Sequence, residues 1–114
     1  CSHLNFLQFT SGGQAREGDN VGHWVIRFAD GSAAEWPLIY GEHVRDFWWI
    51  SNQPREARAA LTAWEGHPNI PAKASCLYKA TWSNPRPDVA IESLDLVSGR
   101  VDATTTAVIA ITAE

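Results

Sequence analysis

The residues best suited to bind a ligand are concentrated in one segment, residues 40–50. It holds one tyrosine, one phenylalanine and two adjacent tryptophans, together with Glu42, His43, Arg45 and Asp46. Aromatic rings offer flat apolar faces for stacking, and the charged groups offer hydrogen bonds. The charges come first and the aromatic residues follow as a block, which fits neither strand alternation nor an amphipathic helix. The segment therefore predicts an irregular connection that is either a core plug or a binding surface.

Motifs for catalysis are absent from the sequence. Several carboxylates are available for paired acid–base chemistry, but no motif links any two of them: Glu42, Asp46, Glu65, Asp88 and Asp95. No serine lies in a nucleophile elbow. The four histidines are scattered, and no H-x-H, HExxH or CxxC pattern occurs, so a transition-metal site has no support. We expect a protein that is not an enzyme.

Length and composition limit the possible classes of protein. The chain has 114 residues, 45% of them hydrophobic, which predicts one globular domain over residues 1–114. A net charge of -4 with only nine Lys and Arg argues against a nucleic-acid partner. No apolar run reaches membrane-spanning length, so membrane insertion is not expected. The sequence begins within a predicted strand, and we expect the domain to come from a larger protein.

Two features leave alternatives open. Cys1 and Cys76 are interpreted as free thiols, and the alternative is a disulfide, which would close a long loop and require an oxidising compartment. The polar, glycine-rich residues 11–20 are interpreted as a solvated loop. Their acidic side chains make a structural calcium ion the alternative, although no spaced Asp pattern is present. No other cofactor is expected.

The pattern along the chain predicts strands and turns. Seven short strands are expected, at residues 3–9, 21–29, 33–40, 59–64, 75–82, 89–98 and 107–113. Asp30-Gly31 predicts a hairpin turn, and Pro37 predicts an edge strand or a bulge. The last strand is apolar enough for burial on both faces. No helix is convincing, so the fold class is all-β, a single antiparallel β-sandwich of jelly-roll type.

Six tryptophans are the anomaly in the composition. Trp24, Trp64 and Trp82 are expected in the core of so small a sandwich. Trp48 and Trp49 are adjacent, so on an extended chain one should be buried and the other exposed. For Arg45 and Asp46 we favour an anchoring role, as an ion pair or as caps on loop amides, over contact with a ligand.

Several segments in order carry a resemblance: VIRFADGS at 25–32, YG to VRDFW at 40–48, AW at 63–64, LY to TWSNPRP at 77–87, SLDLVS at 93–98 and AIT at 110–112. Together they resemble bacterial galactose-binding-like β-sandwich domains, accessory modules of secreted multidomain proteins. The wider fold family includes carbohydrate-binding modules, so the resemblance implies sugar binding. The chain departs from the pattern at Phe47, where Trp is usual, and at Trp36, where an aliphatic residue is usual. Trp36 is therefore a candidate for an added role.

The resemblance and the tryptophan excess together predict a non-catalytic carbohydrate-binding module for a β-glucan-type polysaccharide or oligosaccharide. The expected site residues are Trp48, Trp49, Trp36, Tyr40, Arg45, Asp46, Glu65 and Asn84, with Trp64, Trp82 and Gln53 as further possible contacts. The expected location is extracellular or periplasmic, beside a linked catalytic or surface domain. One alternative is a structural or protein-interaction module. Another is a small jelly-roll metalloenzyme acting on a glycan, with His43 as its first candidate.

Overall fold

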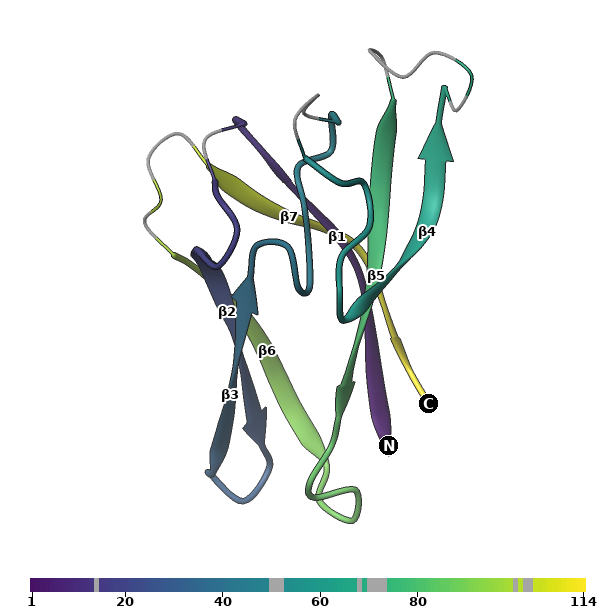
Figure 1. The fold of residues 1–114 in the computed structure, drawn as a ribbon. Coiled ribbons are helices and arrows are strands. Elements are labelled where there is room, and N and C mark those ends of the chain that lie inside the picture. Colours follow the sequence, from purple (N-terminus) through teal and green to yellow (C-terminus); the bar gives the residue numbers. More distant parts are fainter. Residues whose placement is uncertain (14, 50–52, 68, 70–73, 100, 102–103) are drawn as a thin grey trace.

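The computed structural model describes residues 1–13, 15–49, 53–67, 69, 74–99, 101 and 104–114. Within these ranges the regular elements are all strands, and none is a helix that could cross a membrane. In chain order they are β1 (His3–Ser11), β2 (Asn20–Phe28), β3 (Ala33–Ile39), β4 (Ala60–Gly66), β5 (Ser75–Ser83), β6 (Ile91–Ser98) and β7 (Thr105–Ala113) (Figure 1). The seven predicted strands are confirmed, with ends that differ by at most two residues.

The strands form two antiparallel sheets. One has the order β4-β5-β1-β7 and the other the order β3-β2-β6. The pairings β1–β7, β2–β6 and β4–β5 are nested along the chain, and the pairings β1–β5 and β2–β3 complete the two sheets. Connections between β1 and β2, and between β5 and β6, therefore pass from one sheet to the other. This arrangement confirms the predicted antiparallel sandwich of jelly-roll type.

The core lies between the two sheets and follows strand alternation. Trp24, Ile26 and Phe28 of β2 are buried, as the alternating pattern predicts. They meet alternate residues of β1 and β5, and the rings of Phe6 and Trp24 are 4.6 Å apart between centroids. The one amide in this layer, Gln8, accepts a hydrogen bond from the Trp24 indole at 3.2 Å. Trp82 is also buried, as predicted.

Local turn chemistry is confirmed at the β2–β3 hairpin. Gly31 has a φ of 88°, which favours glycine, and its amide donates to the Phe28 carbonyl. The Asp30 carboxylate accepts from the Ser32 amide and from Arg86, and these bonds hold the pKa of Asp30 well below its usual range. Pro37 lies in β3, which is an edge strand, as expected from its missing amide.

Two predictions about burial are wrong. β7 was expected to be buried on both faces, but it is an edge strand, with Ile109 and Ile111 exposed. Trp64 was expected in the core, but it lies in β4, the edge strand at the other side of the same sheet, and it is 50% exposed. A register shift between Thr62 and Trp64 places Trp64 opposite Leu77, whose side chain alternates with the core residues of β5. A hydrophobic pattern alone does not show which strands lie at the edges of a sheet.

The structure shows the surroundings of the two thiols and of the glycine-rich loop. Cys1 and Cys76 are both free, the first exposed and the second buried. In the loop, of which residue 14 lies outside the described residues, the Asp19 carboxylate accepts from the Arg16 amide at 2.9 Å. The parts of the chain that the structure describes contain no group of three His, Cys, Asp or Glu residues placed to hold a metal ion.

Candidate functional site

Residues 45–49 form an inserted segment between β1 and β5, where those two strands separate. Asp46 makes a parallel bridge with Thr10 of β1, and Trp48 makes an antiparallel bridge with Ser75 of β5. The Phe47 amide donates to the Thr10 carbonyl at 2.7 Å, and the Phe47 carbonyl accepts from the Cys76 amide at 2.8 Å. The irregular segment thus completes the sheet at this end. Its last predicted residue, Ile50, lies outside the described residues.

Asp46 anchors the inserted segment. One carboxylate oxygen accepts from the Gly13 amide at 2.8 Å, and the other accepts from the Trp48 amide at 3.1 Å. Burial raises the pKa of Asp46, and the two amide bonds act in the opposite direction. The carboxylate therefore ties the β1–β2 loop to the aromatic block, which confirms the predicted cap on loop amides.

Arg45 anchors the segment on its other side. The residue is only 3% exposed, and its Nε donates to the Glu56 carbonyl at 2.6 Å. Its guanidinium forms an ion pair with Glu17 and lies 5.7 Å from the centre of the Tyr40 ring. Arg45 and Asp46 thus fix different loops, so the predicted anchoring role is confirmed, with Glu17 as the partner of Arg45.

The anchored segment presents an aromatic face on the outside of the four-stranded sheet. The Phe47 and Trp64 rings are nearly parallel, 11° apart, with centroids separated by 6.4 Å. Trp48 is 57% exposed and meets the Phe47 ring edge-on at 5.1 Å. Phe47 also contacts Phe9 of β1 at 5.2 Å. We call Phe47, Trp48 and Trp64 the aromatic face.

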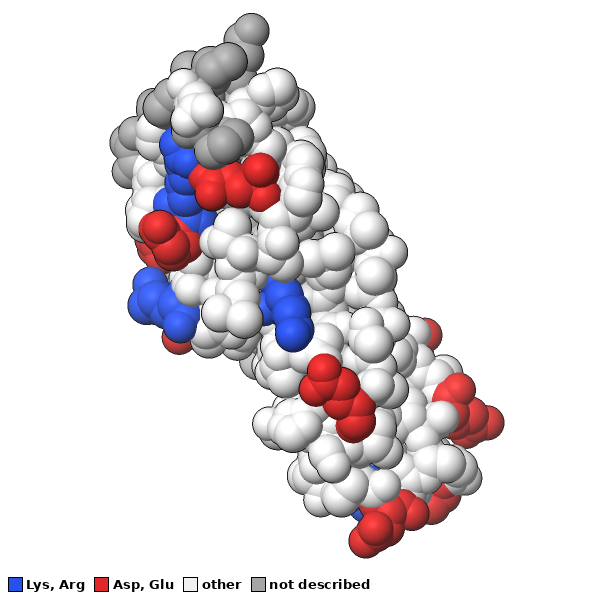
Figure 2. All heavy atoms as spheres, turned by 90° about the vertical axis from the view of Figure 1, so that its right-hand side faces the viewer, with Lys and Arg blue, Asp and Glu red and all other residues white. Residues whose placement is uncertain are grey.

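An apolar groove of about 490 Å³ adjoins this face and is open to solvent. Its lining is apolar throughout: Leu7, Phe9, Phe47, Trp64, Leu77 and Ile109. The side of the molecule that carries β4 is mostly uncharged, and its basic and acidic side chains are spread from the upper left to the lower end of the view (Figure 2). The groove is therefore suited to the apolar face of a ligand, and hydrogen bonds must come from its surroundings.

Trp49 points differently from Trp48. It is half-buried, its indole donates to the Gln53 carbonyl at 2.8 Å, and the Arg55 guanidinium lies 4.9 Å from its ring centre. Of the expected buried and exposed pair, the exposed member is confirmed as Trp48, whereas Trp49 is only half-buried. Trp49 therefore has a positional role, because it contacts Gln53 and Arg55.

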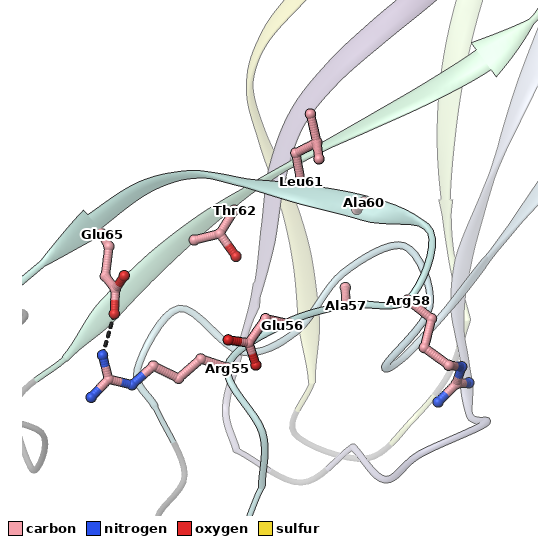
Figure 3. Close-up of a pocket in the computed structure, with 8 residues that line it drawn as sticks. All are labelled: Arg55, Glu56, Ala57, Arg58, Ala60, Leu61, Thr62 and Glu65. Atoms are coloured by element: carbon pink, nitrogen blue, oxygen red, sulfur yellow. Dashed lines mark hydrogen bonds and ion pairs between the residues drawn. The ribbon is translucent and has the colours of Figure 1, made fainter.

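A polar hollow of about 790 Å³ lies between β4 and residues 55–58. Figure 3 shows Thr62 and Glu65 pointing from β4 toward Arg55 and Glu56, and Arg55 forms an ion pair with Glu65. Neighbouring strand residues point to opposite sides, so Trp64 borders the apolar groove while Glu65 borders the hollow. Stacking groups and hydrogen-bonding groups therefore flank the same strand.

The other expected site residues lie apart from this surface. Tyr40 is buried, and its hydroxyl accepts from the Asp46 amide at 3.2 Å and donates to Gln53 at 2.8 Å. Trp36 packs against Phe6 at 5.5 Å at the border of the core. Asn84 is buried at the far end of β5, where its side chain bonds the Cys1 carbonyl and the Arg86 amide. Of the expected site residues, Trp48 thus lies on the aromatic face and Glu65 borders the polar hollow, whereas Trp36 and Asn84 lie elsewhere.

His43, the candidate for a metal site, has a structural contact. Its Nδ1 accepts a hydrogen bond from the Ile39 amide at 2.9 Å, and its ring meets Trp36 edge-on at 5.3 Å. Burial lowers the pKa of His43, and the neighbouring Glu42 acts in the opposite direction. The neutral imidazole is the form that this hydrogen bond requires.

Sequence reasoning missed the contributions of Phe9, Leu7 and Ile109 to the groove. A signal was present in β1, where Leu7 and Phe9 alternate with the core residues, so that both faces of the strand are apolar. With the fold and surface described, the chain was compared with known proteins. No protein-family model, curated protein or solved structure matches it.

Proposed function

We propose that this protein is a non-catalytic carbohydrate-binding module whose aromatic face stacks on a β-glucan-type polysaccharide. The observation that supports the proposal is the pair of exposed indoles, Trp48 and Trp64, contributed by different elements and joined through Phe47. The C–H face of a sugar ring is apolar and flat enough to pack on an indole. Exposed rings held by a fixed backbone keep the cost of ordering low on binding.

Polar groups next to the aromatic face would bind the sugar hydroxyls. Arg55, Glu56, Thr62 and Glu65 border the hollow beside β4, and Arg55 is held by its ion pair and by the Trp49 ring. Planar guanidinium and carboxylate groups suit paired hydroxyls. In this proposal Arg45 and Asp46 act by positioning Trp48, since their polar atoms bond the protein itself.

The wider setting follows from the resemblance to accessory β-sandwich domains. Such a module would be secreted or periplasmic and linked to a catalytic or surface domain. By binding the polysaccharide, it raises the local concentration of the linked domain there. That role requires binding without chemistry. Assays for glycan cleavage, with and without a chelator, would detect the metalloenzyme alternative.

Affinity electrophoresis on a panel of soluble polysaccharides tests the proposal. The protein should be retarded by at least one β-glucan, and Trp48→Ala and Trp64→Ala should each weaken binding about tenfold, because an indole face contributes on the order of 1–2 kcal/mol. Val97→Ala is the matched control, since Val97 is an exposed apolar residue of β6, which belongs to the other sheet. Lack of retardation on every polysaccharide, with folding intact, would refute the proposal.

The apolar groove favours a second candidate, a protein-interaction module. All six of its lining residues are apolar, and sugar sites normally include hydrogen-bonding groups. On this reading the aromatic face docks against another protein domain. Retardation by a glycan that depends on Trp48 would exclude this reading for the aromatic face.

A further inference from the structure

β7 lacks the charged residues and the proline that usually protect strand edges. Among the described strands, β3, β4, β6 and β7 form the four sheet edges. β3 carries Glu35 and Pro37, β4 carries Glu65, and β6 carries Glu92 and Asp95. Charged residues and proline on an edge oppose pairing with another strand. β7, Thr-Thr-Ala-Val-Ile-Ala-Ile-Thr-Ala, contains neither.

The side chains of β7 are also exposed. Residues 109–113 are all exposed, and Ile109 and Ile111 are exposed by 59% and 40%. The strand has one irregularity, a register shift against β1 between Leu7 and Gln8. Beyond it, residues 110–113 pair regularly with β1 and present an unpaired backbone edge on the other side. An apolar, uncharged edge of this kind is a template for a further strand.

We propose that β7 pairs antiparallel with β7 of a second copy of this chain, so that two four-stranded sheets join into one. An apolar, uncharged edge strand is expected to pair with another apolar, uncharged edge. Among the described sheet edges, only β7 is of this kind. Self-pairing at β3, β4 or β6 would place carboxylates in the interface between the two copies. Pairing of β7 with β7 brings no charges within the strand together, and it makes an isologous, two-fold interface.

The dimer has a consequence for the surface described above. A two-fold axis perpendicular to the joined sheet leaves the outer faces of both sheets on the same side. Ile109 borders the groove as well as the dimer edge, so the two grooves would lie on one continuous face. If the aromatic face binds glycans, two sites on one face would add avidity for a polymer. This consequence rests on the proposed function, but the dimer does not.

Sedimentation velocity on a dilution series, without any polysaccharide, tests the proposal. The expected species at high concentration has twice the chain mass of 12.6 kDa, and it dissociates on dilution. Ile111→Lys should shift the sample to the monomer. Val97→Lys is the matched control, because Val97 is also β-branched, lies in the edge strand β6 and is 39% exposed. This control should remain dimeric.

Thr112→Lys is the second edge variant, since it changes an exposed polar residue and is compatible with folding even where Ile111→Lys is not. It too should yield a monomer. Amide hydrogen exchange should show protection in β7 that increases with protein concentration, without a matching increase in β6. A wild-type monomer at every concentration would overturn the proposal, and so would a dimer that persists in folded Thr112→Lys.

Discussion

Trp64 and Phe47 stack with their ring planes 11° apart, although one belongs to an edge strand and the other to a segment inserted between two strands. The contact joins the β4 edge to residues 45–49 across the outside of the sheet. Together with the contacts that Phe47 makes with Phe9 and Trp48, it holds the aromatic face together.

Gly66→Ala should displace the Trp64 ring. A Cβ at residue 66 would lie 2.6 Å from Cη2 of Trp64 and 2.5 Å from Oγ of Ser75, closer than non-bonded atoms allow. We expect a loss of about 1 kcal/mol in the free energy of unfolding and a change in tryptophan fluorescence. In a Trp64→Ala background the same substitution should cost less, since the ring is gone. Equal costs in the two backgrounds would show that the ring does not pack over Gly66.

Trp48→Ala and Trp49→Ala should separate binding from stability. Trp49→Ala removes the indole hydrogen bond to the Gln53 carbonyl and the contact with Arg55, and should lower the free energy of unfolding by about 2 kcal/mol. Trp48→Ala removes a mostly exposed ring and should cost less than about 1 kcal/mol. Urea unfolding of both variants measures the difference. Similar losses would contradict the placement of the two rings on different sides.

Asp46→Ala should destabilise the fold by about 2 kcal/mol. The substitution leaves the partly buried amides of Gly13 and Trp48 without their acceptor, and the loss of two such hydrogen bonds is costly. Asp19→Ala is the control, because Asp19 accepts one amide bond in an exposed part of the same loop and should cost about 0.5 kcal/mol. Urea unfolding compares the two. A larger loss for Asp19→Ala would show that Asp46 is not the anchor.

His43 should make stability depend on pH. Its pKa is lowered by burial from the ordinary 6.5, so the unfolded chain binds the proton more tightly than the folded protein. The stabilisation is therefore complete above pH 6.5 and is lost as the pH falls through the folded pKa. Protonation also removes the acceptor for the Ile39 amide. The unfolding temperatures of wild type and His43→Gln should therefore differ increasingly as the pH falls below 6.5. Parallel curves would contradict the interpretation.

The strands and their core faces were largely readable from the sequence. Trp24, Ile26 and Phe28 alternate with less apolar neighbours, and alternation is a local property of an extended chain. The Asp30-Gly31 turn and the edge position of Pro37 also follow from backbone chemistry within a few residues. These features depend on no distant part of the chain.

Only part of the candidate site could be predicted from the sequence. The sequence placed Trp48 and Trp49 on opposite sides, because adjacent residues of an extended segment must diverge. It did not place Trp64 beside Phe47, since alternation does not distinguish the inner face of a strand from the outer one. Asn84 and Tyr40 were grouped with the site by residue type, yet their hydrogen bonds lie within the fold.

The sequence by itself determined an all-β chain of seven strands, its tight turn and the faces of its central strands, because these depend on short-range periodicity and backbone restrictions. Only the tertiary structure decided that β4 and β7 are edges, that residues 45–49 complete the sheet between β1 and β5, and that Trp64 meets Phe47 in solvent. Those outcomes depend on register and on pairing between segments far apart in the chain. Each strand could pair with several others, and the local sequence pattern does not determine which pairing is the most stable.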